Sequence, residues 1–261
     1  MCLPFGDILM RIIDKMMNNM KKAIVIGASS GIGREVARLL IEEGWTVGLA
    51  ARRDGLLLPM MHANEDRVKV AKIDVTASNA AESLNLLIKR IGGMDLFFYA
   101  AGIGRQNPEL QESIELSTVR TNALGFTRMI GEAYRYFAAN GGGHIAAITS
   151  IAGTKGLGPA PSYSATKAMQ NVYLQALEQQ ATQRGLNIKF TDIRPGFVDT
   201  DLLSGTHQYP MLMKPEPVAK AIVKAVKQQK HICVIDWRWR LLTALWRRIP
   251  RWLWRRLRLI S

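Results

Sequence analysis

Two patterns of hydrophobic and polar positions alternate along this chain: short continuous apolar runs, and longer stretches in which apolar residues recur at helical spacing. The apolar runs predict strands near residues 22–27, 46–50, 68–73, 95–100, 144–149, 188–193 and 231–235. The helical stretches lie near residues 32–43, 78–91, 112–139, 162–184 and 215–229. Continuous apolar strands are typical of a sheet covered by helices on both faces. The pattern predicts an α/β fold, a doubly wound sheet of seven parallel strands with a site at their carboxyl ends.

Length and composition agree with one such domain. The chain has 261 residues, 48% of them hydrophobic, and no internal repeat. Cys2 and Cys233 lie far apart in sequence and form no disulfide framework, so a reducing compartment and a cytoplasmic location are expected. The four histidines are scattered: His62, His144, His207 and His231. Their spacing does not suggest metal ligands, and no metal site is predicted.

A glycine-rich turn follows the first predicted strand. An apolar run ends at Ile26, glycines follow at Gly27, Gly31 and Gly33, and a helical pattern then begins with Val36. Glycines let the backbone turn sharply and approach a pyrophosphate, which the positive end of the helix dipole attracts. A strand, a tight turn and a helix in this order predict a dinucleotide-binding site.

Tyr163 and Lys167 are the second candidate for chemistry. They lie four positions apart in a predicted helix, so both project from one face, and Ser150 precedes Tyr163 by thirteen residues. A nearby cation favours the phenolate, so Lys167 is predicted to lower the pKa of Tyr163. Such a phenol can give or take a proton during carbonyl reduction or alcohol oxidation.

With these motifs in place, the chain resembles the short-chain dehydrogenase/reductase family over residues 21–235. The resemblance implies a single Rossmann-type domain and a catalytic tetrad of Asn122, Ser150, Tyr163 and Lys167. It also implies cofactor contacts from the glycine turn and from the loops that follow later strands. The implied contact residues are Gly27, Ser29, Ser30, Gly31, Ile32, Gly33, Arg34, Arg52, Asp74, Val75, Ala101, Gly102, Tyr163, Lys167, Pro195, Gly196, Val198 and Thr200.

Two positions depart from the family pattern. Ile26 stands where a threonine is usual before the first glycine, and Tyr99-Ala100 replace two asparagines at the end of a strand. Both changes should cost hydrogen bonds that stabilise turns rather than affect the chemistry.

The resemblance implies an oxidoreductase in which hydride passes between a nicotinamide and a carbonyl carbon. Tyr163 would supply the proton, Lys167 would hold the nicotinamide ribose, and Ser150 would hydrogen-bond the substrate oxygen. Asn122 would anchor a water that returns the proton through Lys167. Simpler structural roles stay open for two of these residues. Asn122 would then only bend its helix, and Ser150 would only cap the end of a strand. The alternative function is a cofactor-binding regulator or scaffold with little turnover.

Cofactor choice depends on the end of the second predicted strand. An acidic residue there selects the ribose diol of NAD(H), whereas arginines favour the 2′-phosphate of NADP(H). This strand ends with Arg52 and Arg53, no acid follows before Asp54, and Arg34 adds a positive group after the glycine turn. A guanidinium suits a phosphate because it donates paired hydrogen bonds. The sequence therefore predicts NADP(H) over NAD(H), which in turn favours a reductase.

Residues 201–214 are predicted to form a short flexible lid over the substrate. Its apolar side chains are Leu202, Leu203, Tyr209, Met211, Leu212 and Met213. They favour a hydrophobic ketone, aldehyde or secondary alcohol, although a lid packed on its own core would have the same composition. The family resemblance also implies a homodimer or homotetramer assembled through the helices near 112–139 and 162–184.

Residues 1–20 fit no cleaved signal sequence. Charged residues interrupt the apolar stretch around Leu9, and no small-residue cleavage site follows. A mobile amphipathic leader is the preferred interpretation, and a short helix that touches a membrane is the alternative.

Residues 236–261 form a basic amphipathic tail that the fold does not require. From Trp237 to Ser261 there are eight arginines, five tryptophans and no acid, in a chain of net charge +14. Pro250 should split the tail into two short helices. A helical wheel places one apolar face on the tail: Leu242, Leu245, Trp246, Ile249, Leu253, Leu257 and Ile260. Such a helix fits an anionic membrane surface, which implies a peripheral location on the inner membrane face. Packing at a subunit interface or over the chain's own pocket is a second interpretation, and nucleic-acid binding a third.

Overall fold

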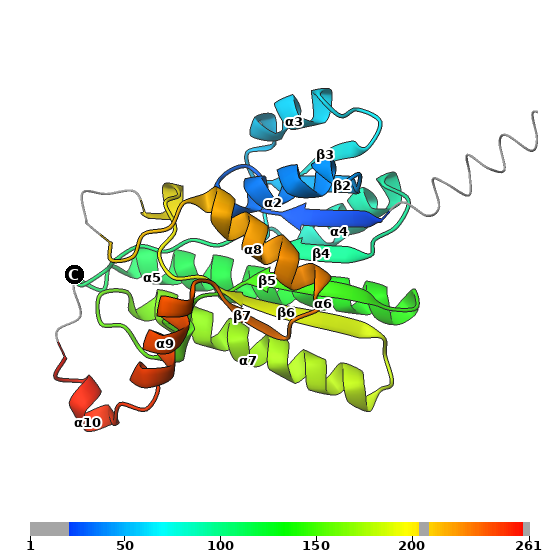
Figure 1. Cartoon of the computed structure of the whole chain (residues 1–261). Helices are drawn as coiled ribbons and strands as arrows, with labels where there is room; N and C mark the ends of the chain where they lie inside the picture. Colours follow the sequence, from blue (N-terminus) through cyan, green and yellow to red (C-terminus); the bar gives the residue numbers. More distant parts are fainter. Residues whose placement is uncertain (1–20, 204–208, 258–261) are drawn as a thin grey trace, which may run out of the picture.

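The computed structural model describes residues 21–203 and 209–257. Seven parallel strands form one sheet in the order β3-β2-β1-β4-β5-β6-β7 (Figure 1). The strands are β1 (Lys22–Ile26), β2 (Thr46–Ala51), β3 (Val68–Lys72), β4 (Leu96–Tyr99), β5 (Gly143–Ile148), β6 (Ile188–Arg194) and β7 (Ile232–Val234). Each predicted strand is confirmed to within one residue at either end, and the doubly wound α/β fold is confirmed with it.

Helices connect these strands and cover both faces of the sheet. The α-helices are α2 (Gly31–Glu42), α3 (Leu58–His62), α4 (Ala80–Arg90), α5 (Glu112–Val119), α6 (Phe126–Ala139), α7 (Pro161–Gln183), α8 (Pro215–Lys227), α9 (Trp237–Trp246) and α10 (Arg251–Trp254). Short 3-10 helices are η1 (Asp54–Leu57), η3 (Ile151–Thr154) and η4 (Asp201–Leu203). The segment η2 (Arg120–Gly125) is π-helical and joins α5 to α6, so the helix predicted over 112–139 is continuous but widened in its middle.

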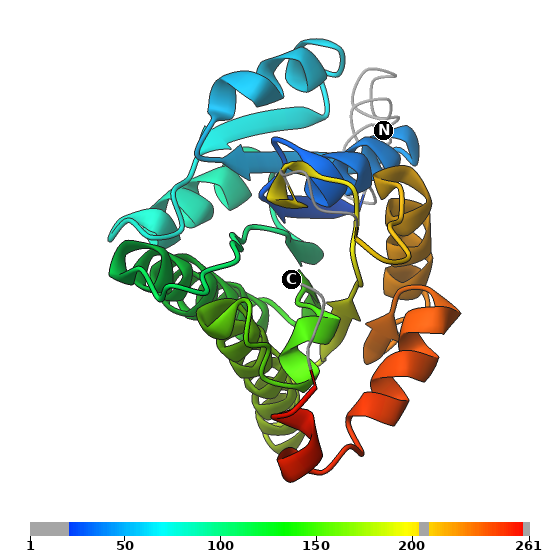
Figure 2. The same cartoon turned by 90° about the vertical axis from the view of Figure 1, so that its left-hand side faces the viewer.

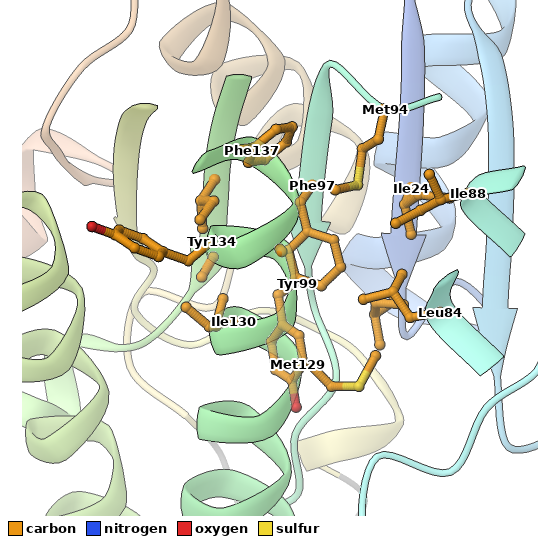
Figure 3. Packing of buried hydrophobic residues seen from close by; sticks show 14 of the residues in the cluster. Ile24, Leu84, Ile88, Met94, Phe97, Tyr99, Met129, Ile130, Tyr134 and Phe137 are labelled. Atoms are coloured by element: carbon orange, nitrogen blue, oxygen red, sulfur yellow. The ribbon is translucent and has the colours of Figure 1, made fainter. Parts of the chain in front are cut away.

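Two hydrophobic clusters lie on opposite faces of the sheet. Alternate residues of each strand point to opposite faces, so Ile24 belongs to the cluster beneath α4 and α6, whereas Val25 belongs to the one beneath α2 and α8. Figure 3 shows the first cluster, in which Phe97, Tyr99 and Met129 pack between the sheet and α6. The continuous apolar runs of the sequence are explained by this burial on both sides.

The two positions that depart from the family pattern are buried within these clusters. Ile26 is 1% exposed, and its carbonyl accepts a 2.8 Å hydrogen bond from the amide of Ala100. Tyr99 is fully buried, its ring packs edge-on against Phe126 with centroids 5.2 Å apart, and its hydroxyl has no hydrogen-bond partner. The hydrogen bonding at the end of β1 is therefore kept. The cost in stability of the departure comes from the buried hydroxyl of Tyr99, which has no hydrogen-bond partner.

The predicted division of the tail at Pro250 is present, with α9 before the proline and α10 after it. Both helices lie at the end of the molecule where the loops after β5 and β6 emerge (Figure 1). The predicted leader over residues 1–20 lies outside the described residues, as do Arg258 and Ile260 of the tail. In the part of the chain that the structure describes, no helix is long and apolar enough to cross a membrane.

Candidate active site

The glycine turn joins β1 to α2 and brings its backbone against the end of β4. Gly27 has a φ of +85°, which favours glycine, and its amide donates a 2.8 Å hydrogen bond to the carbonyl of Ala50. A Cβ at Gly27 would lie 2.6 Å from the amide nitrogen of Ala101, and one at Gly33 would lie 2.3 Å from the carbonyl oxygen of Gly27. The close backbone approach therefore requires glycine at both positions.

The amino-terminal end of α2 is suited to an anion. Ser30 precedes the helix without making a side-chain capping hydrogen bond, and the first turn contains no acidic residue. The amides of this turn are thus available to a pyrophosphate, together with the positive end of the helix dipole. Ser29 and Ile32 lie in the same turn and are half-buried. Thr200 faces it from the loop after β6, because a Cβ at Gly31 would lie 3.0 Å from its methyl group. The residues present therefore fit a dinucleotide.

Two arginines lie at the corner where the predicted 2′-phosphate would bind. Arg34 in the first turn of α2 and Arg52 directly after β2 are both exposed. Asp74, after β3, accepts hydrogen bonds from the amide and the hydroxyl of Thr76 at 2.9 and 2.7 Å. Although burial opposes them, these bonds and the charge of Arg52 hold the pKa of Asp74 below its usual value. Asp74 is therefore ionised, and it shares its corner with Arg52.

The other predicted contact positions after β3 and β4 link this corner to the tetrad. Val75 is 4% exposed, and a Cβ at Gly125 would lie 2.7 Å from its side chain, so the π-helix passes close above it. A Cβ at Gly102 would lie 3.4 Å from Asn122 Oδ1 and 3.7 Å from Lys167 Nζ. Gly102 thus stands where the predicted cofactor contacts meet the predicted tetrad.

Ser150 and Tyr163 form one side of the predicted tetrad. Ser150 follows β5, and its Oγ accepts a 3.0 Å hydrogen bond from the amide of Ala152, which caps η3. The same side chain hydrogen-bonds Tyr163. The capping role that the sequence left open for Ser150 is therefore real and coexists with its contact to the phenol. A Cβ at Gly153 would lie 2.6 Å from the backbone of Lys167, so η3 packs tightly against α7.

The predicted effect of Lys167 on Tyr163 requires correction. Burial raises the pKa of Tyr163, and the hydrogen bond from Ser150 only partly opposes this shift. Lys167 Nζ lies over the ring, 5.7 Å from its centroid, while the backbone at Gly104 passes so close that a Cβ there would lie 2.7 Å from the ring. The phenol is therefore protonated at neutral pH and is a proton donor in its resting state.

Lys167 is buried under the site with two hydrogen-bond acceptors. Its Nζ donates to the carbonyl of Ile148 at 3.1 Å and to Gln170 Oε1 at 3.0 Å. Burial lowers the pKa of Lys167 to about 8, against the attraction of the nearby Asp192 carboxylate. That carboxylate is itself buried and paired with Arg194 at 2.5 Å. The ammonium form of Lys167 thus prevails at neutral pH.

Asn122 lies in the π-helix and holds the loop after β4. Its Oδ1 accepts from the amide of Ile103 at 2.9 Å, and its Nδ2 donates to the carbonyl of Ile103 at 2.7 Å. The backbone carbonyl of Asn122 accepts a 2.7 Å hydrogen bond from Gln170 Nε2. The side chain of Gln170 thus connects this carbonyl to Lys167. The water that Asn122 is predicted to anchor stays a prediction.

Trp239 of α9 packs against the loop that follows β6. It is 2% exposed, and a Cβ at Gly196 would lie 2.2 Å from its Nε1, which is buried without a hydrogen-bond partner. Its ring packs edge-on against Phe197, whose other neighbour is Tyr209 at 4.7 Å between centroids. Beside this loop Pro195 is buried. The tail therefore supplies part of the wall next to the predicted nicotinamide position.

Part of the predicted lid also pairs with this loop. Val198 forms a parallel bridge with Met213, and the amide of Met213 donates a 3.0 Å hydrogen bond to the carbonyl of Phe197. Met213 packs on the hydrophobic core, as the alternative interpretation of the lid held, whereas Leu202 and Leu212 are exposed. Residues 204–208 lie outside the described part of the chain.

Comparison with known proteins decides the family. A family model for short chain dehydrogenases matches residues 21–209. The chain belongs to the short-chain dehydrogenase family. An uncharacterized oxidoreductase of Staphylococcus aureus (strain USA300) is 32% identical to it over 219 residues, which cover 82% of this chain and 94% of the relative. This short-chain dehydrogenase is thus an oxidoreductase that acts on CH–OH or C=O groups with a nicotinamide cofactor.

Solved structures share the fold of this short-chain dehydrogenase. ElxO with NADP bound matches with a TM-score of 0.75 and 22% identity, covering 85% of this chain and 99% of its own. The 3-ketoacyl-(acyl-carrier-protein) reductase from Brucella melitensis, complexed with NADH, matches with a TM-score of 0.74 and 22% identity, covering 83% and 96%. The same fold therefore accommodates either form of the cofactor.

Sequence reasoning missed three side chains of this short-chain dehydrogenase site: Gln170, Asp192 and Trp239. Gln170 lies three positions after Lys167 in α7, a spacing that places both on one helical face and was available as a signal. Asp192 and Trp239 reach the site only through the order of the strands and the packing of the tail, so no local pattern indicated them.

Among the described residues, no group of three or more histidine, cysteine, aspartate or glutamate side chains could hold a metal ion.

Proposed function

We propose that the protein is an NADPH-dependent reductase of apolar ketones and aldehydes. The observation that carries the cofactor choice is a pair of exposed guanidinium groups. Arg34 lies at the start of α2, and Arg52 directly follows β2. The end of β2 carries no acidic residue, since the first acid after Arg52 is Asp54, which already belongs to η1. Two guanidinium groups at this corner favour a 2′-phosphate.

The protonated state of Tyr163 supports reduction as the working direction. The glycine turn at the start of α2 would hold the nicotinamide cofactor, which would supply the hydride for the carbonyl carbon. Tyr163 gives its proton to the carbonyl oxygen as negative charge develops there, and Ser150 donates a hydrogen bond to the same oxygen. The ammonium of Lys167 then stabilises the phenolate that remains. A carbonyl thus gains one hydride and one proton and leaves as an alcohol.

The substrate class follows from the wall beside the loop after β6. Phe197, Tyr209 and Trp239 form an aromatic series there, and the exposed Leu202 and Leu212 flank it. Such side chains favour an apolar chain over a sugar. Each methylene of a substrate that becomes buried against them should raise kcat/KM about fourfold until the wall is covered.

The test is turnover of straight-chain ketones and aldehydes of increasing length with NADPH or NADH, beside a polyhydroxylated carbonyl of similar size. We expect NADPH to be preferred and kcat/KM to rise with chain length. Tyr163→Phe should lose roughly 10²–10⁴-fold in kcat while it still binds NADPH. Tight NADPH binding without turnover of any carbonyl would instead support the regulator or scaffold function.

We also propose that two or four copies assemble through the helices α5, η2 and α7. These elements leave apolar side chains exposed, with Leu116, Leu124 and Val172 at 44%, 50% and 64%. Light scattering of the purified protein tests this, and Val172→Glu should shift it towards the monomer. A monomer at micromolar concentration in the unaltered protein would contradict the proposal.

A further inference from the structure

The tail turns one face of α9 towards the catalytic domain. Trp239 and Thr243 are 2% and 4% exposed, and Trp246 is half-buried. These positions recur at four and three residues, so they form one stripe along the helix. Trp246, which the helical wheel grouped with the apolar face of the tail, thus lies on the side of α9 that packs on the domain.

Four contacts fix the tail to the loops that follow β5 and β6. Trp246 Nε1 donates to Thr154 Oγ1 at 2.5 Å, and Lys155 Nζ donates to the carbonyl of Ile249 at 2.8 Å. After Pro250, Trp254 Nε1 donates to the carbonyl of Gly156 at 2.8 Å. The fourth contact is the indole of Trp239 on the Gly196 loop. The tail is therefore a docked part of the domain, and Figure 2 shows α10 beside the start of α7.

Besides this stripe, both helices of the tail leave apolar side chains exposed in the described chain. Leu241, Leu245 and Trp252 are 55%, 57% and 58% exposed. The complete exposed apolar set is Trp237, Leu241, Leu242, Leu245, Trp252, Leu253 and Leu257, and we call it the tail surface. Seven exposed apolar side chains within residues 237–257 are a denser group in sequence than the single, scattered exposures that folded proteins normally show.

Beyond the first turn of α9, the charged side chains of the tail itself are all positive. Arg238 pairs with Asp236, which precedes the helix. The other described arginines of the tail are exposed: Arg240, Arg247, Arg248, Arg251, Arg255 and Arg256. No acidic residue occurs from 237 onward to balance them. Apolar side chains framed by arginine, with tryptophan at the boundary, match an anionic lipid surface in both hydropathy and charge.

We propose that the tail surface docks on an anionic lipid bilayer and lies in its interface. Neither α9 nor α10 is long enough to span the hydrocarbon core, so the helices lie along the surface. Because the inner face of α9 touches the Gly196 loop, docking brings the bilayer beside the wall of the substrate site. An apolar carbonyl could then enter from the lipid, a consequence that rests on the proposed function, whereas the docking itself does not.

The test is co-sedimentation of the full-length protein with phosphatidylcholine vesicles that contain or lack phosphatidylglycerol. We expect binding to the anionic vesicles only, weakening as salt is raised. Arg240→Gln/Arg247→Gln should weaken binding roughly thirtyfold, at about fivefold per charge. Leu241→Glu/Leu245→Glu should abolish it. The matched control is Lys220→Gln/Lys224→Gln, which removes two exposed charges from α8 and should leave binding unchanged.

Every variant is also titrated with NADPH, so that loss of vesicle binding with cofactor binding intact reports on the tail and not on the fold. No binding of the unaltered protein to anionic vesicles would overturn the proposal, and so would equal binding to vesicles without phosphatidylglycerol. A change of oligomeric state in Leu241→Glu/Leu245→Glu, without vesicle binding by the parent, would make the tail surface a subunit contact. Failure of carbonyl turnover with vesicle binding intact would contradict only the proposed reaction.

Discussion

Gln170 Oε1 accepts a 3.0 Å hydrogen bond from the ammonium of Lys167, and both side chains are buried. The amide nitrogen of the same glutamine donates to the carbonyl of Asn122 at 2.7 Å. The π-helical geometry around Asn122 opens the regular hydrogen-bond ladder, which leaves that carbonyl available. Gln170 is therefore a positioning residue that holds Lys167 against the π-helix.

Replacement of Gln170 should change the pH dependence of the reaction. Gln170→Leu removes one acceptor from a buried ammonium, so the pKa of Lys167 should fall below about 8 by roughly one unit. The alkaline limb of kcat/KM, where Lys167 loses its proton, should move to lower pH. Gln170→Glu should move it to higher pH, because a carboxylate favours the ammonium. Shifts in the same direction for both variants, or none, would exclude this role.

Gly196 should not accept a side chain, because Trp239 occupies the space. A Cβ at Gly196 would lie 2.2 Å from the indole nitrogen, so Gly196→Ala should displace α9 and cost about 1–3 kcal/mol of stability. Trypsin should then cleave the tail arginines faster. Gly158→Ala is the control, since a Cβ there meets nothing within 4 Å. Equal protease resistance in the two variants would show that the tail does not rest on this loop.

Removal of the Tyr99 hydroxyl should not destabilise the core. The group is buried without a partner between the sheet and α6 (Figure 3). Tyr99→Phe should leave the free energy of unfolding unchanged or raise it by about 1–2 kcal/mol, because a desolvated donor disappears. The half-buried Tyr136 provides the control, whose phenylalanine variant should be neutral. A loss of stability in Tyr99→Phe alone, measured by urea unfolding, would reveal a partner for this hydroxyl.

Acidification should destabilise the fold through His144. Burial and the charge of Lys189 lower the pKa of His144 to about 4, and its Nε2 lies 2.8 Å from Thr191 Oγ1. The unfolded chain binds this proton near pH 6.5 and the folded chain only near 4, so stability falls between those values by up to about 3 kcal/mol. His144→Asn should lose this part of the slope, whereas His62→Asn, at an exposed site, should keep it. Identical slopes in urea titrations of all three proteins would contradict the assignment.

Much of the fold was predictable because its signals are local. Each strand is an apolar run between polar turns, and the glycines of the turn after β1 determine its backbone geometry locally. Pro250 interrupts the helix of the tail regardless of what the tail contacts. The short helix α3 was missed because Pro59 and two methionines leave no helical periodicity in five residues. The π-helix was missed because its widening serves partners, Ile103 and Gln170, that lie far from Asn122 in sequence.

The sequence predicted which residues of the candidate site lie together, but it did not predict their electrostatics. The spacing of Tyr163 and Lys167 predicted their common face, but the direction of the tyrosine pKa depends on how deeply the ring is buried. That burial comes from Gly104 and from the close packing of η3 on α7, which only the folded chain brings together. The contact of Trp239 with Gly196 is of the same kind, since forty-three positions separate the two residues.

The most direct test of the account is a fluorescence titration of the protein with NADPH and with NADH. We expect NADPH to bind at least about tenfold more tightly, and Arg34→Ala/Arg52→Ala to lose roughly 10- to 100-fold for NADPH while its affinity for NADH is kept. Arg38→Ala, on the same helix but held by Glu35 and Glu42, should behave like the parent. Equal affinity for both cofactors, or an arginine variant that still prefers NADPH, would contradict the proposed cofactor and the role of the two arginines.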